Sequence, residues 1–221
     1  MTPTILQPVD LPRHRFDDPD GIYGVRYFGS TLRGALVEVF DQFRTHPTTE
    51  HELTDVSEVE GGDVLSDERS GRVPEKWLAS QFIAVGKVRD PVEFIDVMEE
   101  ELLSKLNLRP RIRQILDSDI TAFGAPPTLN FGSVQSSGVS ARKLTQAVSR
   151  EIHEDPDLLA GIRFSSRFCN DETCWAAFEG RADIIFDPST VSRLDPLNAE
   201  HVQAVRSAAE VLRLDLPPNW S

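Results

Sequence analysis

The sequence is poor in cysteine, has no long apolar run and carries fewer basic than acidic residues. Its two cysteines, Cys169 and Cys174, cannot form the disulfide framework on which small secreted domains depend. No stretch approaches the roughly eighteen apolar residues that a membrane-spanning helix requires. The first residues, MTPTILQPVDLPRHR, contain early prolines and an acid but no apolar core, unlike a secretory signal. We therefore expect a soluble cytoplasmic protein that does not bind membranes.

The charge balance limits the partners that this chain can have. Its 36 acidic residues stand against 23 basic ones, which gives a formal net charge of −13. A general nucleic-acid-binding protein needs a basic surface that displaces counterions from the phosphates. We therefore expect no direct binding to nucleic acid. An acidic surface can still contain a small basic pocket, so an anionic small molecule is not excluded as a ligand.

The local motifs of common nucleotide-binding, hydrolytic and metal sites are absent. The chain has no GxGxxG or GxxxxGK[ST] phosphate loop and no GxSxG nucleophile elbow. Cys169 and Cys174 are spaced C-x4-C without a second pair of ligands, and the five histidines form no HExxH pattern. We therefore predict no metal site and no required cofactor.

The stretch HRFDDPDGIYGVRYFG concentrates carboxylates within positions 17–20. A calcium loop would need alternating oxygen donors and a distal glutamate, but Pro19 interrupts the spacing and no glutamate follows at the required distance. Pro19 and Gly21 are residues that favour a turn. We therefore interpret Asp17 and Asp18 as parts of a turn whose carboxylates accept backbone N–H groups.

The first half of the chain predicts a strand, a helix and a long loop. Aromatic and β-branched residues predict a strand over 22–28. An apolar stripe at helical spacing predicts a helix that is capped by Ser30 or Thr31 and carries Glu38 on the flank of the stripe. The polar, glycine-containing stretch around 45–75 predicts a long loop or insertion.

The rest of the chain mixes strands and helices without a regular βαβ alternation. We expect a strand over 82–88, a strand or helix start over 91–98, a helix over 99–106, a loop-rich stretch over 125–138, and strands over 161–168, 174–180 and 182–187. Two further helices are predicted, one capped by Ser140 and ending before Pro156, and a last one capped by Asp195. This pattern favours an α+β fold, with a compact mixed sheet flanked by helices in a single domain over 1–221.

Two segments carry weak motifs whose order is more informative than any one of them. HRFDDPDGIYGVRYFGSTLRGALVEVF has Arg-Phe, an Asp-x-Pro turn, a strand ending in tyrosine and a helix with glutamate. LTQAVSREIHEDPDLLAGIRFSSRF has a helix beginning Leu-Thr-Gln and then Gly-Ile-x-aromatic-x-Ser-x-Arg, and CWAAFEGRADIIF follows as a strand. In this order, over about residues 13–44 and 120–190, the chain resembles the RES domain, named for its Arg, Glu and Ser.

The resemblance implies a set of site residues. The family's arginine falls on Arg15, its strand tyrosine on Tyr27, its glutamate on Glu38 and its serine on Ser166. Two positions depart from the family. The first motif reads His-Arg-Phe-Asp where Gly-Gly-Arg-Trp-Asn is common, and Phe164 stands where tyrosine is frequent.

The resemblance also implies an activity and a partner. The RES fold is similar to that of ADP-ribosyltransferases, and members that act as toxins consume NAD by breaking its nicotinamide–ribose bond. The bond is cleaved by phosphorolysis or hydrolysis, so NAD is the substrate and inorganic phosphate is the co-substrate in the first case. Such toxins are commonly paired with a small helical antitoxin that covers the pocket. The resemblance thus implies the toxin of a toxin–antitoxin pair, acting as an NAD+ phosphorylase or NAD+ glycohydrolase.

The residue types at these positions suit that chemistry. A guanidinium binds phosphate oxygens bidentately, so Arg15 is expected to anchor the NAD diphosphate. Cleavage of the N-glycosidic bond builds positive charge on the ribose, and a carboxylate such as Glu38 stabilises that charge. Tyr27 offers a flat ring to the nicotinamide, and Ser166 offers a hydrogen bond to the ribose or the carboxamide.

Phosphorolysis needs a second anion-binding group, which Arg26 or Arg167 can supply. Long-range steering of NAD and phosphate is unfavourable for a chain of net charge −13, so these arginines must act at short range. Two other functions stay open. One is ADP-ribosyl transfer to a macromolecule, which cleaves the same bond with a different nucleophile. The other is a catalytically silent RES-fold protein that binds a nucleotide or a partner, which the two departures from the family motif favour.

Overall fold

The computed structural model describes residues 14–44 and 71–221, and these form two compact units. The sheet unit contains the described residues up to Phe28 together with Gly86–Ile185. The α1/α8 unit contains the described residues of Gly29–Val85 together with Phe186–Ser221. The chain therefore passes between the units more than once. Most of the predicted loop around 45–75 lies outside the described residues.

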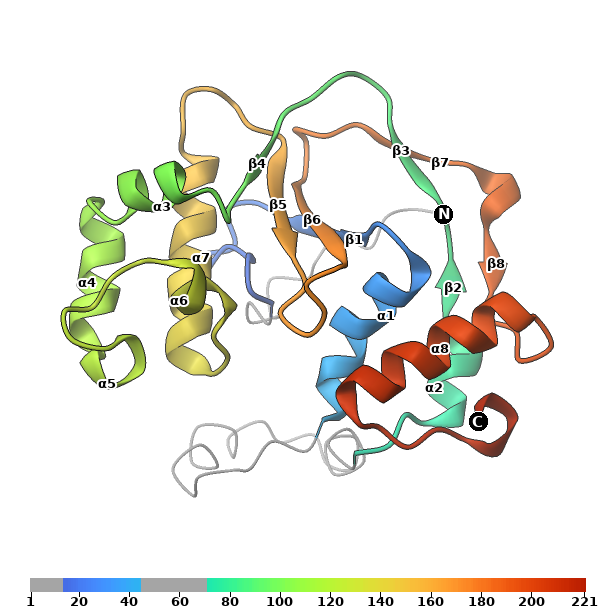
Figure 1. Ribbon diagram of the computed structural model, residues 1–221. Coiled ribbons are helices and arrows are strands. Elements are labelled where there is room, and N and C mark those ends of the chain that lie inside the picture. Colours follow the sequence, from blue (N-terminus) through green and yellow to red (C-terminus); the bar gives the residue numbers. More distant parts are fainter. Residues whose placement is uncertain (1–13, 45–70) are drawn as a thin grey trace. The chain divides into compact units, whose positions relative to one another are not determined.

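The sheet unit is built on a four-stranded sheet of order β1-β6-β5-β4 (Figure 1). Its strands are β1 (Val25–Gly29), β4 (Phe94–Asp96), β5 (Gly161–Ser165) and β6 (Thr173–Phe178). β5 and β6 form an antiparallel hairpin, whereas β4 runs parallel to β5. The prediction of an α+β fold with a mixed sheet is therefore confirmed. The open choice at 91–98 is also decided, because this stretch contains strand β4.

Helices cover the sheet of this unit. They are α3 (Glu100–Leu106), α4 (Pro110–Ser118), α5 (Ile120–Phe123), α6 (Phe131–Gln135) and α7 (Val139–His153). α7 lies beside α4 (Figure 1) and buries the predicted apolar stripe, which consists of Leu144, Ala147, Val148 and Ile152. These side chains join apolar residues of the sheet, of α4 and of the turn before β1 in one core, including Phe16, Ile112, Leu116, Ile162, Phe164 and Phe178.

The start of α7 differs from the prediction. Gly138 precedes the helix with a φ of +98°, which glycine adopts without the steric cost of a side chain. Ser140 lies inside the first turn, and its hydroxyl donates to the carboxylate of Asp119 rather than capping the helix. The predicted cap at Ser140 was therefore wrong, because the helix already begins at Val139 and Gly138 occupies the cap position.

The α1/α8 unit pairs two amphipathic helices, α1 (Leu32–Phe40) and α8 (Ala199–Leu212). Thr31 caps α1 by accepting a hydrogen bond of 2.9 Å from the backbone N–H of Gly34, as predicted. Asn198, and not Asp195, caps α8 by accepting from the backbone N–H of Glu200 at 2.9 Å. Asp195 instead accepts from Leu197 N in the turn before the helix.

Several short helices and strands complete the fold. They are η1 (Asp41–Phe43), α2 (Glu75–Ser80), η2 (Pro188–Thr190), η3 (Pro218–Trp220) and the paired strands β2 (Phe82–Ile83) and β8 (Ser192–Arg193). β3 (Gly86–Val88) pairs with β7 (Ile184–Phe186). The stretch 82–88 thus forms two short strands instead of the single one predicted. Within the described ranges, no helix is long and apolar enough to cross a membrane.

Candidate functional site

The acidic stretch near the N-terminus forms a turn whose carboxylates are bound by protein groups. Asp17 accepts a hydrogen bond of 2.8 Å from the backbone N–H of His14. Asp18 is fully buried, accepts from the backbone N–H of Ile22 and forms an ion pair of 2.6 Å with Arg150 of α7. The interpretation of these carboxylates as turn scaffold is therefore confirmed. Figure 1 shows how this segment leads directly into β1.

Tyr27 of β1 binds the turn through its hydroxyl group. Its hydroxyl donates to Asp17 at 3.0 Å and accepts from the backbone N–H of Phe16 at 2.9 Å. Burial of the hydroxyl and, secondarily, the negative charge of Asp17 raise the pKa of Tyr27 well above 10. The phenol therefore stays protonated at neutral pH, and it lies beside the residue that follows Arg15. Tyr27 thus lies next to the segment that carries Arg15.

Arg15 is held in the core of the sheet unit and is 8% exposed. Its Nη2 donates to the backbone carbonyl of Val134 in α6 at 2.7 Å. Its guanidinium carbon lies 5.2 Å from the ring centre of Phe16 and 5.3 Å from that of Phe164, distances at which an aromatic ring attracts a cation. These contacts fix the guanidinium against β5 before any ligand binds.

Ser166 follows β5 directly and is fully buried. Its backbone N–H donates to Glu172 O at 2.9 Å, and its hydroxyl oxygen accepts from the backbone N–H of Phe168 at 3.2 Å. Ser166 therefore sits in the loop that joins β5 to β6, two positions after the Phe164 ring against which Arg15 packs. Residues far apart in sequence thus meet near the carboxyl end of β5.

Gln135, at the end of α6, is a candidate that sequence reasoning missed. Its side-chain Nε2 donates to the backbone carbonyl of Ser165 at 3.4 Å. Its Oε1 is buried and has no hydrogen-bond partner among the described residues. No motif marks Gln135, because it lies in the loop-rich stretch 125–138. Only the fold brings it next to β5. We call Arg15, Tyr27, Gln135, Phe164 and Ser166 the Arg15 cluster.

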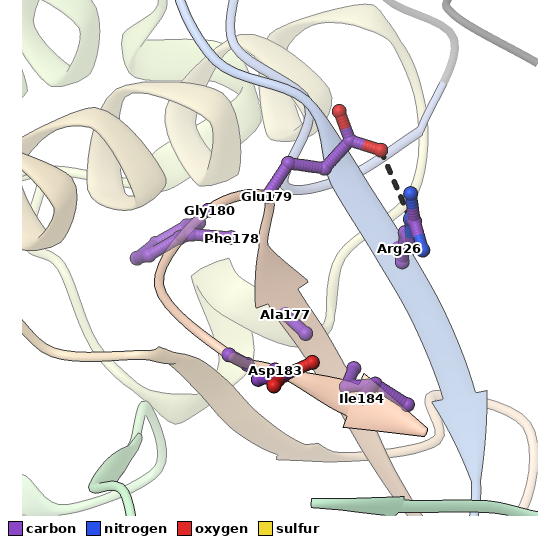
Figure 2. Close-up of a pocket in the computed structure, with 8 residues that line it drawn as sticks. Arg26, Ala177, Phe178, Glu179, Gly180, Asp183 and Ile184 are labelled. Carbon is purple, nitrogen blue, oxygen red and sulfur yellow. Dashed lines mark hydrogen bonds and ion pairs between the residues drawn. The ribbon is translucent and has the colours of Figure 1, made fainter. Parts of the chain in front are cut away.

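The predicted phosphate-binding residue Arg26 does not join the Arg15 cluster. Side chains alternate along a strand, so Arg26 points away from the face of β1 on which Tyr27 packs against the core. Its Nε forms an ion pair of 2.9 Å with Glu179, and both side chains are about 40% exposed. Arg26 and Glu179 line a cavity of about 380 Å³. Asp183 and Ile184 line it as well (Figure 2). We call it the Arg26 cavity.

The remaining predicted residues, Arg167 and Glu38, lie in different units. Arg167 follows Ser166 in the loop after β5, is half-buried, and places its guanidinium carbon 4.7 Å from the ring centre of Phe168. Glu38 belongs to α1 in the α1/α8 unit and lies on the flank of its buried stripe, as predicted. The Oε1 of Glu38 is buried and has no hydrogen-bond partner among the described residues.

The described residues contain no group of three or more His, Cys, Asp or Glu side chains that could hold a metal ion. Cys169 and Cys174 are both buried. Comparisons with protein-family models, with curated proteins and with solved structures each find no match to this chain. The resemblance to the RES domain therefore rests on the order and spacing of its motifs.

Proposed function

We propose that this protein is an NAD-degrading enzyme of the RES type, with an ADP-ribosyltransferase-like fold, that cleaves the nicotinamide–ribose bond. The observation that carries the proposal is the contact of Arg15 with the ring of Phe164, two residues before Ser166 at the end of β5. Arg15 and Ser166 are separated by most of the sheet unit in sequence, and the RES motif order assigns them to one site. Arg15 contacts both Phe164 of β5 and Val134 of α6, which supports placing it in the same site as the residues that follow β5.

In the proposed reaction, the bond between ribose C1′ and the nicotinamide nitrogen breaks. Its electron pair neutralises the pyridinium nitrogen, and an oxygen of phosphate or water forms the new bond to C1′. The resemblance assigns to Glu38 the carboxylate that stabilises the developing positive charge and, in hydrolysis, accepts the proton of the attacking water. This division of roles needs no covalent enzyme intermediate and no resident cofactor.

The Arg15 cluster supplies the binding groups in this proposal. Arg15 offers a guanidinium held rigid for the diphosphate, since its rotamer is already set by Val134 and the two phenyl rings. The Ser166 hydroxyl can donate to the ribose or carboxamide while it accepts from Phe168 N. Arg167, next to Ser166 in the chain, is the better candidate for co-substrate phosphate, because Arg26 lies on the other face of β1.

The structure also changes the role that we propose for Tyr27. Its hydroxyl already makes two hydrogen bonds, to Asp17 and from Phe16 N. We therefore assign it to holding the turn that carries Arg15, instead of to contacting nicotinamide through the hydroxyl. The cytoplasmic toxin role and a small helical antitoxin as partner follow from the RES resemblance and belong to the same proposal.

One observation favours a second candidate, a RES-fold protein that binds a nucleotide or a partner without turnover. Arg15 is 8% exposed and lies between two aromatic rings, which is also how a purely structural arginine is held. This alternative predicts that NAD is not consumed at any phosphate concentration.

The test is a nicotinamide-release assay on the purified protein with NAD, with and without inorganic phosphate. Phosphate-dependent release supports phosphorolysis, release without phosphate supports hydrolysis, and label from adenine-labelled NAD on an added macromolecule supports ADP-ribosyl transfer. Glu38→Gln should lower release about a hundredfold or more. The matched control is Glu101→Gln, an exposed carboxylate on α3 that forms an ion pair of 2.7 Å with Lys105. Absence of release from a folded wild-type protein would contradict the enzymatic proposal.

A further inference from the structure

The backbone beside Gln135 offers an acceptor that the sheet does not use. Ser166 N donates to Glu172 O at 2.9 Å, so this pair is a hydrogen-bonded position of the β5–β6 hairpin. Such positions alternate along an antiparallel pair, so the preceding Ser165 directs its backbone groups away from β6. On that side lies β4, but β4 ends at Asp96, opposite Arg163. The carbonyl of Ser165 therefore extends past the end of β4.

Gln135 reaches this carbonyl from α6. A backbone carbonyl can only accept, so it fixes the Gln135 amide with Nε2 toward Ser165 O, at 3.4 Å, and leaves Oε1 on the other side. Oε1 is buried without a hydrogen-bond partner among the described residues, a state that disfavours the folded protein unless something compensates for it. Gln135 as a whole residue is only partly buried, and the inference that follows requires a rotation of its terminal amide that turns Oε1 toward the ligand.

We infer that Gln135 is a specificity-determining residue that recognises the primary carboxamide of the nicotinamide ring. Gln135 Oε1 and Ser165 O are two acceptors on neighbouring groups, and a primary amide provides two hydrogens on one nitrogen, whereas a hydroxyl provides only one. This inference rests on the proposed function for the identity of the ligand. A nicotinic acid group, which is a carboxylate and cannot donate, would place negative oxygens against these two acceptors.

The geometry predicts a preference for the amide over the acid form of the dinucleotide. A site built to hydrogen-bond one group discriminates against an analogue that leaves its buried polar atoms unpaired. The wild-type protein should therefore cleave NAD with a higher kcat/KM than nicotinic acid adenine dinucleotide. Gln135→Met, which keeps the length of the side chain but removes both polar atoms, should reduce this preference at least about tenfold.

The change in this preference between the wild type and Gln135→Met measures the contribution of Gln135 alone. The intrinsic reactivities of the two dinucleotides are the same for both proteins and cancel when the wild-type ratio is divided by the variant ratio. Gln114→Met is the matched control, since Gln114 is exposed on α4, and it should leave the ratio unchanged. The melting temperature of Gln135→Met should stay close to that of the wild type, because the variant removes a buried unpaired acceptor together with the long hydrogen bond to Ser165 O.

A binding measurement separates this inference from the proposed function. Ligand-observed NMR with free nicotinamide and free nicotinate requires no turnover. Nicotinamide binding that is lost in Gln135→Met, without any NAD cleavage by the wild type, would support the inference and overturn the proposed enzymatic activity. NAD cleavage with an unchanged preference in Gln135→Met would support the proposed enzymatic activity and overturn the inference about Gln135. A melting temperature lowered by several degrees with an unchanged preference would assign Gln135 a structural role and overturn the inference.

Discussion

Arg15 and Arg26 flank the same acidic turn, yet their side chains lie in opposite environments. Arg15 is 8% exposed and is held by Val134 O and two phenyl rings. Arg26 has about 40% of its side chain exposed at the cavity of Figure 2. A guanidinium that is already ordered loses little rotamer entropy when an anion binds, whereas an exposed one must be ordered by the ligand. The difference favours the Arg15 cluster over the Arg26 cavity as the ligand site.

Two arginine–carboxylate pairs of the sheet unit also differ in burial. Asp18 is fully buried against Arg150, which has 12% of its side chain exposed. Glu179 pairs with Arg26 where both side chains are about 40% exposed to water. Removing one partner of a buried pair leaves an uncompensated charge, whereas water replaces a lost partner at the surface. The pair of Asp18 and Arg150 should therefore tolerate substitution poorly, and the pair of Glu179 and Arg26 should tolerate it well.

The largest effect is expected for Asp18→Asn. This substitution removes the charge that compensates Arg150 and weakens the acceptor for Ile22 N. We expect the free energy of unfolding to fall by about 3 kcal/mol, the lower end for breaking a buried pair, because Arg150 keeps Glu154 as a second partner. Urea denaturation measures the change.

Asp20→Asn is the matched control for this prediction. Asp20 belongs to the same turn, but it is exposed and its carboxylate lies 3.9 Å from Arg150. Its substitution should change the free energy of unfolding by less than about 0.5 kcal/mol. Equal losses in the free energy of unfolding of Asp18→Asn and Asp20→Asn would show that the burial of Asp18 does not increase the stability that its ion pair provides.

The next largest effect is a loss of activity, for which Arg15→Lys is compared with Arg26→Lys. Arg15→Lys keeps the charge but loses the planar fork that binds phosphate bidentately. We expect kcat/KM for nicotinamide release to fall about a hundredfold, which corresponds to about 2.7 kcal/mol of transition-state stabilisation. Arg26→Lys should change kcat/KM by less than about twofold. The opposite order of effects would move the ligand site to the Arg26 cavity.

The limits of sequence reasoning are visible in these same residues. The acidic turn was predictable, because Pro19 and Gly21 have local conformational preferences that the rest of the fold does not override. The separation of Arg26 from Tyr27 was also readable, since neighbours on a strand point to opposite faces, but grouping them by residue type ignored this alternation.

Gln135 shows what the sequence could not predict. Its importance depends on β4 ending opposite Arg163, two residues before Ser165, and on α6 reaching the carbonyl of Ser165, and both are long-range features. The caps at Thr31 and Asn198 show the intermediate case. Several residues near each helix start could serve as the cap, and the surrounding structure decides which one does.

A smaller effect is expected for Tyr27→Phe. The hydroxyl makes two hydrogen bonds in a buried site, so its loss should lower the free energy of unfolding by about 1–2 kcal/mol at neutral pH. The pH dependence provides the check. The folded pKa of Tyr27 lies above the unfolded value of about 10, so its contribution is fully present below that pH and is lost as the pH rises toward the folded pKa.

Urea denaturation of both proteins between pH 8 and 11 tests this sign. The stability of the wild type should decline more steeply above about pH 10 than that of Tyr27→Phe, because only the wild type must retain the Tyr27 proton in order to stay folded. Parallel declines would show that the Tyr27 hydroxyl is solvated in the folded state.

The smallest effect is expected at the Arg26 cavity. Glu179→Gln keeps the shape and a hydrogen-bond acceptor for Arg26 Nε but removes the charge, in a place where both side chains contact water. The free energy of unfolding should fall by about 0.2–1 kcal/mol, and the difference should shrink further in 0.5 M salt, because exposed pairs are screened. Urea denaturation at low and high salt measures both quantities. A loss above about 2 kcal/mol that persists at high salt would mean that this pair is as well shielded from water as Asp18 and Arg150, and the contrast between the two sides of β1 would disappear.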